Sequence, residues 1–349
     1  MNTILFERYQ QAKKENKGKY TRNLADHLNV SEAEILHSRV SKDGSQRLSA
    51  NIPDLLQALS TIGEVKAITR NEFAISQQIG QYDNAKFSSH AGLFLNPRGL
   101  DLRMFFAQWD SVFALNENIS NGEHHSIQFF DKHGDALHKV YATEHTDMSA
   151  WNALIKQYAT EHNPELIINK VQPFSEQPIN EALAQQLEQQ WRSMTDVHQF
   201  FILLKNNNLS RQQVFRAVSD ELAWQVPINS LSQLLSIAHE QQNEIMLFVG
   251  NRGCVQIFTG LIERLSPLFE EDSGINWLNV FNSNFTLHMI ENGVTECWVT
   301  QKPTQDGFVT SLEVFDRNGN QIIQMYGQRT EGEPEQKIWR DQILSLPKI

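Results

Sequence analysis

The residue with the clearest potential for metal chemistry is His198, in the segment SMTDVHQFFILLKNNNLSRQQVF. Asp196 is placed to cap a helix there, and Val197, Phe201 and Leu204 recur at the spacing of an apolar helix face. His198 borders that face, so its imidazole could point into an apolar pocket and bind the metal of a cofactor held there. The same spacing more often belongs to a half-exposed histidine in the first turn of a helix, and taken alone it favours that plainer interpretation.

A second candidate is Arg103, in the segment GLDLRMFFAQW. Strand alternation puts Leu102 and Met104 on one face, and Asp101, Arg103 and Phe105 on the other. An arginine that shares a face with an aromatic ring can donate hydrogen bonds while Phe105 lies against a flat apolar ligand. An arginine on a solvated sheet face has the same pattern, so both interpretations stay open.

A third group of side chains could bind the carboxylates of an apolar ligand. It comprises Arg211, Lys302, Tyr326 and Arg329. A charge-assisted hydrogen bond to a carboxylate contributes roughly 1.5 to 3 kcal/mol. Singly, each of these residues is also typical of a solvated surface. Phe248 is more typical of a core than of a ligand contact.

Composition limits the class of protein. The chain has 349 residues, with 41 acidic and 30 basic side chains and a net charge of -11. This acidity argues against binding to a nucleic-acid backbone, which requires a surplus of Lys and Arg. The mean hydropathy of -0.44 is that of a water-soluble globular protein. No apolar run approaches the roughly 20 residues that cross a bilayer, and the N-terminus lacks the pattern of an export signal. We therefore expect a cytoplasmic protein without membrane insertion.

The number and spacing of the cysteines and histidines predict no structural metal site. The chain contains two cysteines, Cys254 and Cys297, with no CxxC pair. Its 12 histidines are scattered and form no HExxH motif. The adjacent His124 and His125 lie in a turn-like NGEHH segment, which is typical of solvated side chains. Neither a disulfide framework nor a zinc site is expected.

The chain repeats itself. SIQFFDKHGDALHKVY, residues 126–141, matches SLEVFDRNGNQIIQMY, residues 311–326, at a constant offset of 185. In each copy an apolar run reaches Asp-x-x-Gly and a second run follows, which predicts a β-hairpin. Upstream, EVKAITRNEFAIS from Glu64 resembles EIMLFVGNRGCVQ from Glu244. The order of helices, strand meander and closing helix is common to both copies.

The expected helices occupy residues 3–15, 53–61, 148–159 and 180–193, and Ser31-x-x-Glu34 predicts a capping box. Residues 163–179 are the candidate linker. Strands joined by short turns predict antiparallel sheets, so the class is α+β. We predict a tandem structural repeat with flanking helices, in which residues 1–170 form the first half and residues 171–349 the second.

Four segments together resemble the haemin-degrading, haem-utilisation proteins of Gram-negative bacteria, the HemS/ChuS/HmuS type. They are LNPRGLDLRMF, TDVHQFFILLKNNNLSRQQ, WVTQKPTQDGFVTSLEVFDRNG and QMYGQRTEGEPE. With the duplication, the resemblance covers essentially the whole chain. It implies two similar repeats, each with a large antiparallel sheet, and a haem site associated with the second.

The resemblance also implies roles for residues. It makes His198 the axial ligand of the haem iron, and it makes Arg103 a distal residue near bound oxygen species. Both are thereby candidates for catalysis. It implies contacts to the haem b ring and propionates from Phe105, Arg211, Phe248, Lys302, Tyr326 and Arg329. Lys302 is the weaker assignment, because the length of its loop varies.

Two functions follow from the resemblance. The first is an enzyme that accepts haem from an inner-membrane importer and opens the ring to release iron, with an external reductase supplying electrons and O2 or peroxide as oxidant. The second is a haem chaperone or storage protein that is not the physiological degrading enzyme. Transcription control is a third class, suggested only by the helix-turn-helix-like segment around Ser31, and the acidic charge argues against it. The sequence is compatible with a monomer or a homodimer.

Overall fold

The computed structural model describes residues 2–16, 20–49, 51–119, 122–172, 174–330 and 332–349. Its helices are α1 (Asn2–Glu15), α2 (Thr21–Leu28), α3 (Glu32–Arg39), α4 (Ile52–Ala58), α5 (Met148–Tyr158), α6 (Glu181–Arg192), α7 (Gln199–Asn207), α8 (Arg211–Ala217), α9 (Ser230–Gln241) and α10 (Lys337–Leu344). Short 3-10 turns cover η1 (Leu59–Thr61), η2 (Phe106–Gln108) and η3 (Glu291–Gly293). Among these described residues, no helix is both long and apolar enough to cross a bilayer.

The strands form two antiparallel sheets of nine strands each. Those of the first half of the chain are β1 (Ser45–Leu48), β2 (Gly63–Arg70), β3 (Ala74–Gly80), β4 (Ala85–Phe87), β5 (Ala91–Phe94), β6 (Asp101–Phe105), β7 (Trp109–Ile119), β8 (Gly122–Asp131) and β9 (Ala136–Thr146). Those of the second half are β10 (Ala223–Val226), β11 (Ile245–Gly250), β12 (Cys254–Gly260), β13 (Arg264–Glu270), β14 (Ile275–Phe281), β15 (Phe285–Ile290), β16 (Glu296–Thr304), β17 (Gly307–Phe315) and β18 (Gln321–Gly327).

One sheet has the order β1-β7-β8-β9-β2-β3-β15-β14-β13, and the other has the order β10-β16-β17-β18-β11-β12-β6-β5-β4. The orders are equivalent when each strand of the first half is exchanged for its counterpart in the second. The predicted α+β class with two large antiparallel sheets and flanking helices is therefore confirmed.

Internal contacts divide the chain into two compact units. The first comprises Met1–Arg70, Gln77–Gln172 and Asn251–Gln256. The second comprises Asn71–Ser76, Pro173–Gly250 and Ile257–Ile349. Each unit thus includes a short segment from the other half of the sequence, and the main division lies within the candidate linker.

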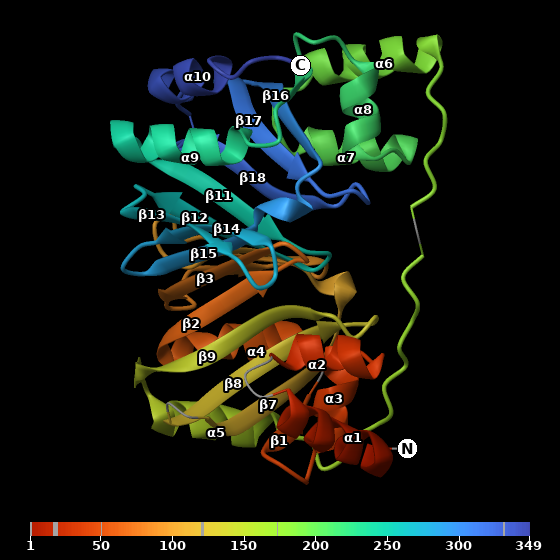
Figure 1. Cartoon of the computed structure of the whole chain (residues 1–349), viewed down its shortest axis with the longest axis vertical. Helices are drawn as coiled ribbons and strands as arrows, with labels where there is room; N and C mark the ends of the chain where they lie inside the picture. The colour runs from red at the N-terminus through yellow and green to blue at the C-terminus, as the bar shows by residue number, and fades with distance from the viewer. Residues whose placement is uncertain (1, 17–19, 50, 120–121, 173, 331) are drawn as a thin grey trace. The chain divides into compact units, whose positions relative to one another are not determined.

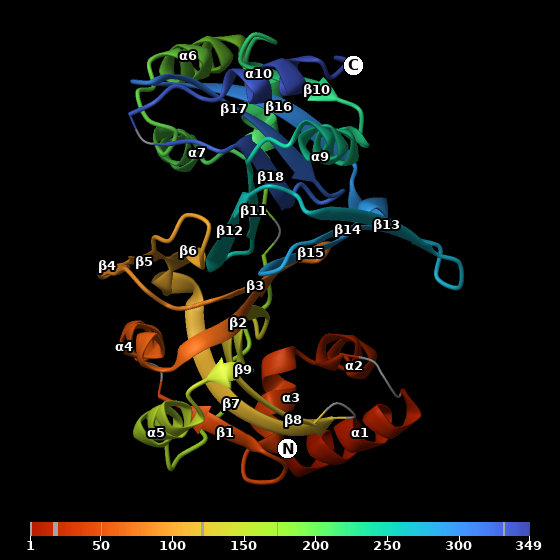
Figure 2. The same cartoon turned by 90° about the vertical axis from the view of Figure 1, so that its left-hand side faces the viewer.

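Helices cover both faces of the strands in the first unit. On one side, α4 and α5 pack on alternate strand residues such as Val112 and Phe129. On the other side, α1, α2 and α3 pack on Phe113 and Phe130, the residues that directly follow Val112 and Phe129 in the strands. Figure 2 shows these two groups of helices on opposite sides of β7 and β8. The period of two in a strand therefore supplies two separate cores from the same strands.

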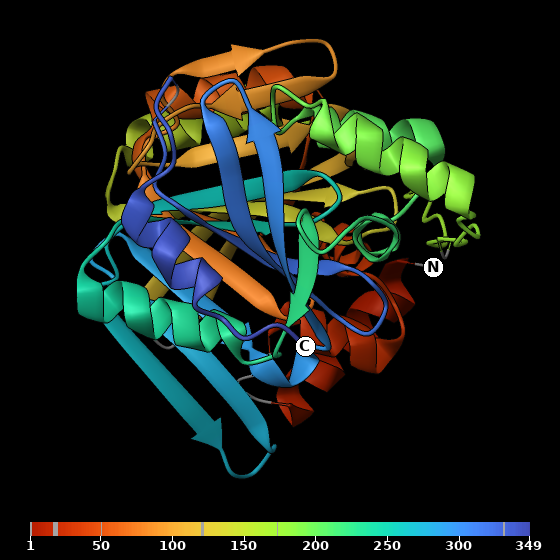
Figure 3. The same cartoon turned by 90° about the horizontal axis from the view of Figure 1, so that it is seen from above.

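The second unit has the same design (Figure 1). Helices α9 and α10 pack on Cys297, Val299 and other residues of one strand face. Figure 3 shows these two helices lying across the same sheet. Helices α6, α7 and α8 contact Trp298 and Phe315 of the opposite face. This second face, covered by α6–α8, carries Lys302 and Glu313, two charged residues of the candidate site.

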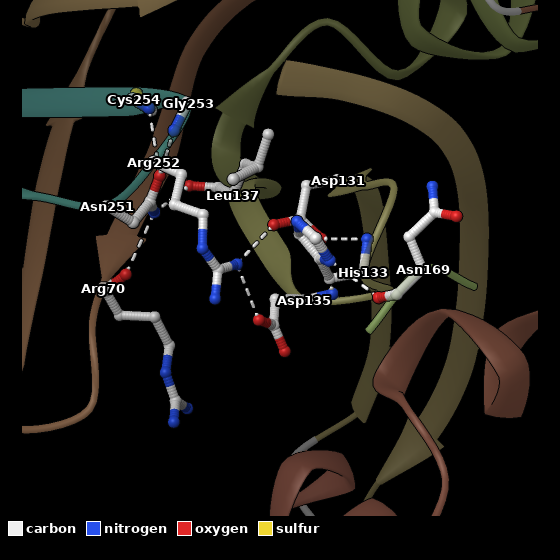
Figure 4. Close-up of polar contacts among 10 residues, drawn as sticks. All are labelled: Arg70, Asp131, His133, Asp135, Leu137, Asn169, Asn251, Arg252, Gly253 and Cys254. Atoms are coloured by element: carbon white, nitrogen blue, oxygen red, sulfur yellow. Dashed lines mark hydrogen bonds and ion pairs between the residues drawn. The ribbon is translucent and has the colours of Figure 1, made fainter. Parts of the chain in front are cut away.

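The tip of the β11–β12 hairpin and the start of β12, Asn251–Gln256, belong to the first unit. Figure 4 shows the polar contacts of Asn251 and Arg252 at this tip. The Asn251 amide donates hydrogen bonds to the main-chain oxygens of Arg70, at 3.0 Å, and Leu137, at 2.8 Å. Arg252 forms ion pairs with Asp131, at 2.6 Å, and with Asp135, at 2.9 Å. These bonds connect a distant segment of the sequence to β2 and to the turn between β8 and β9.

The second unit repeats this arrangement with Asn71. Its amide donates to the main-chain oxygens of Gly250, at 3.0 Å, and Ile322, at 2.8 Å. Asn71 and Asn251 occupy equivalent positions of the two copies, and so do Leu137 and Ile322. The duplication therefore preserves a tertiary hydrogen-bond pattern as well as strand order.

Most local predictions agree with the structure. The predicted hairpins correspond to β8–β9 and β17–β18, which pair antiparallel. Ser31 and Glu34 form the predicted capping box of α3. A second capping box, Ser210 with Gln213, opens α8 and was not predicted.

One buried cluster of the first unit joins the side chains of Thr69, Tyr82, His138 and Cys254. The hydroxyl of Thr69 lies 2.9 Å from Nδ1 of His138, and the Tyr82 hydroxyl contacts Nε2. Burial lowers the pKa of His138 to about 3, so the imidazole is neutral in the folded protein. It also raises the pKa of the Cys254 thiol to about 12.

Neutral burial of His138 predicts a loss of stability in mild acid. The unfolded chain takes up a proton near the ordinary histidine pKa of about 6.5, whereas the folded chain does so only near pH 3. Stability is therefore complete above about pH 6.5 and falls as pH decreases, by about 2 kcal/mol between pH 7 and pH 5. Urea unfolding of the wild type and of His138→Gln at both pH values measures this difference. Equal acid losses in the two proteins would contradict the prediction.

Candidate functional site

His198 lies at the start of α7, in the second unit, with its side chain 81% exposed. Asp196 Oδ1 accepts a hydrogen bond from the His198 main-chain N–H at 2.7 Å and lies 2.7 Å from ring Nδ1. A carboxylate can only accept, so Nδ1 carries the proton of the neutral ring. The Nε2 lone pair is then free to bind a metal.

The prediction that Val197, Phe201 and Leu204 form the buried apolar face of α7 is wrong. The helix begins at Gln199 and buries Phe200 and Leu203, whereas Phe201 is 55% exposed and Ile202 57% exposed. The reason is tertiary: Phe200 contacts Trp191 of α6 and Phe215 of α8, which fixes the rotation of the helix. Apolar side chains beside His198 are therefore left at the surface, where a flat apolar ligand could cover them.

A buried carboxylate, Glu313 on β17, joins two of the predicted basic residues. Arg211 Nη1 lies 2.9 Å from its Oε2, and Lys302 Nζ lies 2.7 Å from its Oε1. Arg211 is the first residue of α8, and the capping box positions that end of the helix. The side chain of Glu313 is completely buried. One carboxylate thus faces two basic groups, so positive charge is in excess when both are protonated.

Lys302 lies beneath the surface rather than at a rim. Its side chain is 3% exposed, and Nζ lies 5.0 Å from the centre of the Phe200 ring and 5.7 Å from that of Trp191. Nζ also donates to Thr300 Oγ1. Burial lowers the pKa of Lys302, and Glu313 opposes this shift. The ammonium group of Lys302 is therefore enclosed by Glu313, Thr300 and aromatic rings rather than presented at the surface.

Burial disfavours ionisation of Glu313, but Arg211 and Lys302 more than compensate and hold its pKa at about 2. The carboxylate is also bound by Gln321 Nε2, 2.8 Å from Oε2. Glu313 is thus a permanent anion at neutral pH. It fixes the position of the Arg211 guanidinium, whose carbon lies 4.9 Å from the centre of the exposed Phe201 ring.

Tyr326 and Phe248 extend the same strand face. Tyr326 lies opposite Ser311 in the β17–β18 register, and its ring centre is 5.0 Å from that of Phe248 on β11. Burial raises the pKa of the Tyr326 hydroxyl, so it remains a neutral donor. Tyr326 is half-buried beside Glu313 and Arg211, both of which influence its ionisation.

Arg329 follows β18 and pairs with Asp306 in the turn between β16 and β17, at 3.3 Å. The neighbouring Gln305 N–H donates to the Thr195 carbonyl at 3.0 Å, which ties that turn to the segment before His198. Arg329 also lowers the pKa of Asp196, after the larger effect of the hydrogen bonds from His198. Arg329 and His198 therefore lie in one region of the second unit.

Sequence reasoning missed Glu313 and the ring contact of Asp196. Glu313 could have been noticed from the duplication, because Gln128 occupies its position in the first copy. Gln128 is also buried, and it donates to Ser126 at 3.0 Å. An anion in place of an amide is a divergence between the copies. No local signal, by contrast, distinguishes an Asp that caps a helix from one that contacts the ring.

Arg103 and Phe105 belong to β6 of the first unit. The predicted alternation is confirmed: Leu102 and Met104 are buried, and Arg103 forms an ion pair with Asp101 on the other face. Arg103 Nη1 also donates to the Leu102 carbonyl at 3.0 Å. Phe105 is 41% exposed, beside an Arg103 side chain that is 27% exposed. A guanidinium and an exposed ring are therefore available on one strand face.

The fold is an antiparallel α+β unit that occurs twice, and the second copy carries a polar face. Comparison of the chain with known proteins identifies the class to which such a protein belongs. The family model described as "Haemin-degrading HemS.ChuX domain" matches residues 29–158 and again residues 208–346. The chain belongs to this family.

Its relatives align over nearly their whole length. The hemin transport protein HmuS of Yersinia pestis is 57% identical over 348 residues, which cover 99% of this chain and 98% of that protein. The heme-degrading enzyme ChuS of Escherichia coli O157:H7 is 50% identical, with a TM-score of 0.92 and 99% coverage of both chains. The heme-binding protein PhuS of Pseudomonas aeruginosa is 34% identical, with a TM-score of 0.93 and complete coverage of both chains.

The shared carboxylate predicts an asymmetric response to mutation. Glu313→Gln leaves Lys302 buried without its anion, and we expect a loss of about 3 to 5 kcal/mol. Lys302→Met should cost less, because Arg211 still neutralises Glu313. Combining the two changes should recover part of the Glu313→Gln loss. Urea unfolding of the three variants tests this order, and an additive double variant would contradict the coupling.

Proposed function

We propose that the protein binds one haem at the second unit, with Nε2 of His198 as the axial ligand of the iron. The observation that carries this proposal is the Asp196–His198 contact, 2.7 Å long, which favours the tautomer with its proton on Nδ1 and leaves the Nε2 lone pair free on an exposed ring. The apolar surface of Phe201 and Ile202 beside it suits one face of a porphyrin.

The charges of the same region suit the two haem propionates. Arg211 and Arg329 are the proposed ionic contacts, and the Tyr326 hydroxyl is a proposed neutral donor. Lys302 contributes positive charge from below the surface, since Glu313 and the aromatic rings enclose it. Phe248 is a proposed ring contact of this unit, and the same role for Phe105 rests on the family resemblance alone. Propionate binding at these residues would compensate the excess positive charge around Glu313.

The names of the relatives support haem as the ligand. The Yersinia pestis relative is called a hemin transport protein, the Pseudomonas aeruginosa relative a heme-binding protein, and ChuS a heme-degrading enzyme. We propose that this protein accepts imported haem in the cytoplasm and opens the ring to release iron. The alternative is a chaperone that transfers haem to a separate enzyme.

Ring opening requires an oxidant and electrons, which we propose come from O2 or peroxide and from an external reductase. The protein's own contribution is to hold the iron through His198 and to fix the rotation of the ring through its propionates. Arg103 is the proposed distal residue, whose guanidinium could donate hydrogen bonds to the oxidant. This distal role, like delivery by an inner-membrane importer, rests on the family resemblance.

The ligand assignment predicts that His198→Ala changes haem binding. We expect the Soret maximum to shift and affinity to fall at least tenfold, because the iron loses its protein ligand. His288→Ala is the matched control, since that half-buried imidazole is bonded to Asn279 in another part of the unit. Haemin titration followed by absorbance measures both. Equal effects of the two substitutions would disprove the assignment.

Turnover distinguishes the enzyme from the chaperone. With haemin, a reductase system and catalase, the enzyme should lose its Soret band and yield an open tetrapyrrole and free iron. Arg103→Ala should retain haem but change the rate or the product. A Soret band that survives many equivalents of reductant in the wild type would favour the chaperone.

A further inference from the structure

Asp196 is a charged group in direct contact with the proposed iron ligand. Its Oδ1 lies 2.7 Å from ring Nδ1 of His198 and accepts the main-chain N–H of the same residue, also at 2.7 Å. Two bonds from one residue to one carboxylate oxygen fix both the turn and the ring orientation. The side chain of Asp196 is 58% exposed, so its position depends on these local bonds rather than on core packing.

An acceptor on the far nitrogen changes the strength of an imidazole ligand. A histidine that donates its second N–H to a carboxylate is a stronger electron donor than one that donates to water, because negative charge develops on the ring. A stronger donor stabilises ferric iron relative to ferrous iron, and second-sphere hydrogen bonding is one of the means by which a protein sets haem potential. The contact therefore has a chemical consequence beyond orientation.

We propose that Asp196 is a positioning residue that tunes His198 as an iron ligand: it holds the ring with Nε2 outward and increases its electron donation, so that bound haem is kept in the ferric state until a strong reductant acts. This inference rests on the proposed function, because it requires His198 to bind the iron. It adds a residue that neither the family resemblance nor the comparisons assign.

Other groups around His198 do not replace this carboxylate. Within the described part of the chain, the polar contact of the His198 ring is the one with Asp196. Asp306, whose neighbour Gln305 contacts Thr195, binds Arg329 and the Gly332 N–H instead. Thr195, which precedes Asp196, is held by Gln199 Oε1 through its own N–H and by Gln305 through its carbonyl. Two hydrogen bonds of Thr195 therefore anchor the backbone that leads into Asp196.

Asp196→Asn separates charge from geometry. The amide oxygen can still accept from the main chain and from Nδ1, but it carries no negative charge. In the ferrous haem complex, we expect the Fe–His stretching frequency to move lower in the resonance Raman spectrum and the Fe(III)/Fe(II) midpoint potential to rise. Asp196→Ala removes the acceptor altogether and should change both quantities further. Haem should still bind one to one in both variants.

Asp220→Asn is the matched control, because it removes an exposed acid of the same unit whose side chain pairs with Lys348. It should leave frequency and potential unchanged. Wild-type values in Asp196→Asn and Asp196→Ala would overturn the inference and make Asp196 a turn residue only. A wild-type Fe–His band that persists in His198→Ala would instead overturn the ligand assignment, so the two failures are distinguishable.

Discussion

The completely buried carboxylate of Glu313 organises the polar face of the second unit. It binds Arg211 from α8, Lys302 from β16 and Gln321 from β18, so three separate elements converge on two oxygen atoms. Removing such a group from water is costly unless ionic and hydrogen-bonding partners compensate. Arg211 and Lys302 are therefore fixed in position together with Glu313. The nearby surface as a result carries the guanidinium of Arg211 in a fixed place and an excess of positive charge.

Aromatic packing determines which of these charges reaches the surface. Trp191, Phe200 and Phe215 enclose Lys302 and leave Arg211 closer to solvent, with side-chain exposure of 3% and 14% respectively. The same packing rotates α7 so that Phe201 faces outward. The aromatic core of the second unit thus buries Lys302 and positions Arg211. It also leaves an apolar surface exposed next to His198. An apolar ligand with carboxylate groups matches this combination of features.

Comparison of the two units separates scaffold from specialisation. Both units keep an asparagine at a hairpin tip, Asn71 or Asn251, whose amide spans two main-chain oxygens. Both also keep a serine capping box before a helix on the equivalent face. At the position of Glu313, however, the first unit has the uncharged Gln128. The repeat therefore conserves what holds strands and helices together and varies the charge of the face that they carry.

Local sequence patterns were sufficient to predict much of this structure. Period-two alternation, Asp-x-x-Gly turns and capping motifs depend only on residues that are close together in the chain. The antiparallel α+β class, the hairpins, the alternation around Arg103 and the duplication were all determined by the sequence itself, and resemblance supplied the list of candidate residues. The tertiary structure alone decided that Lys302 is buried, that α7 exposes Phe201, and that Glu313 receives Arg211 from 102 residues away. It also decided that Asp196 contacts the ring of His198. The physical reason is that periodicity shows which side chains share a face, whereas burial and charge pairing depend on the elements packed against that face.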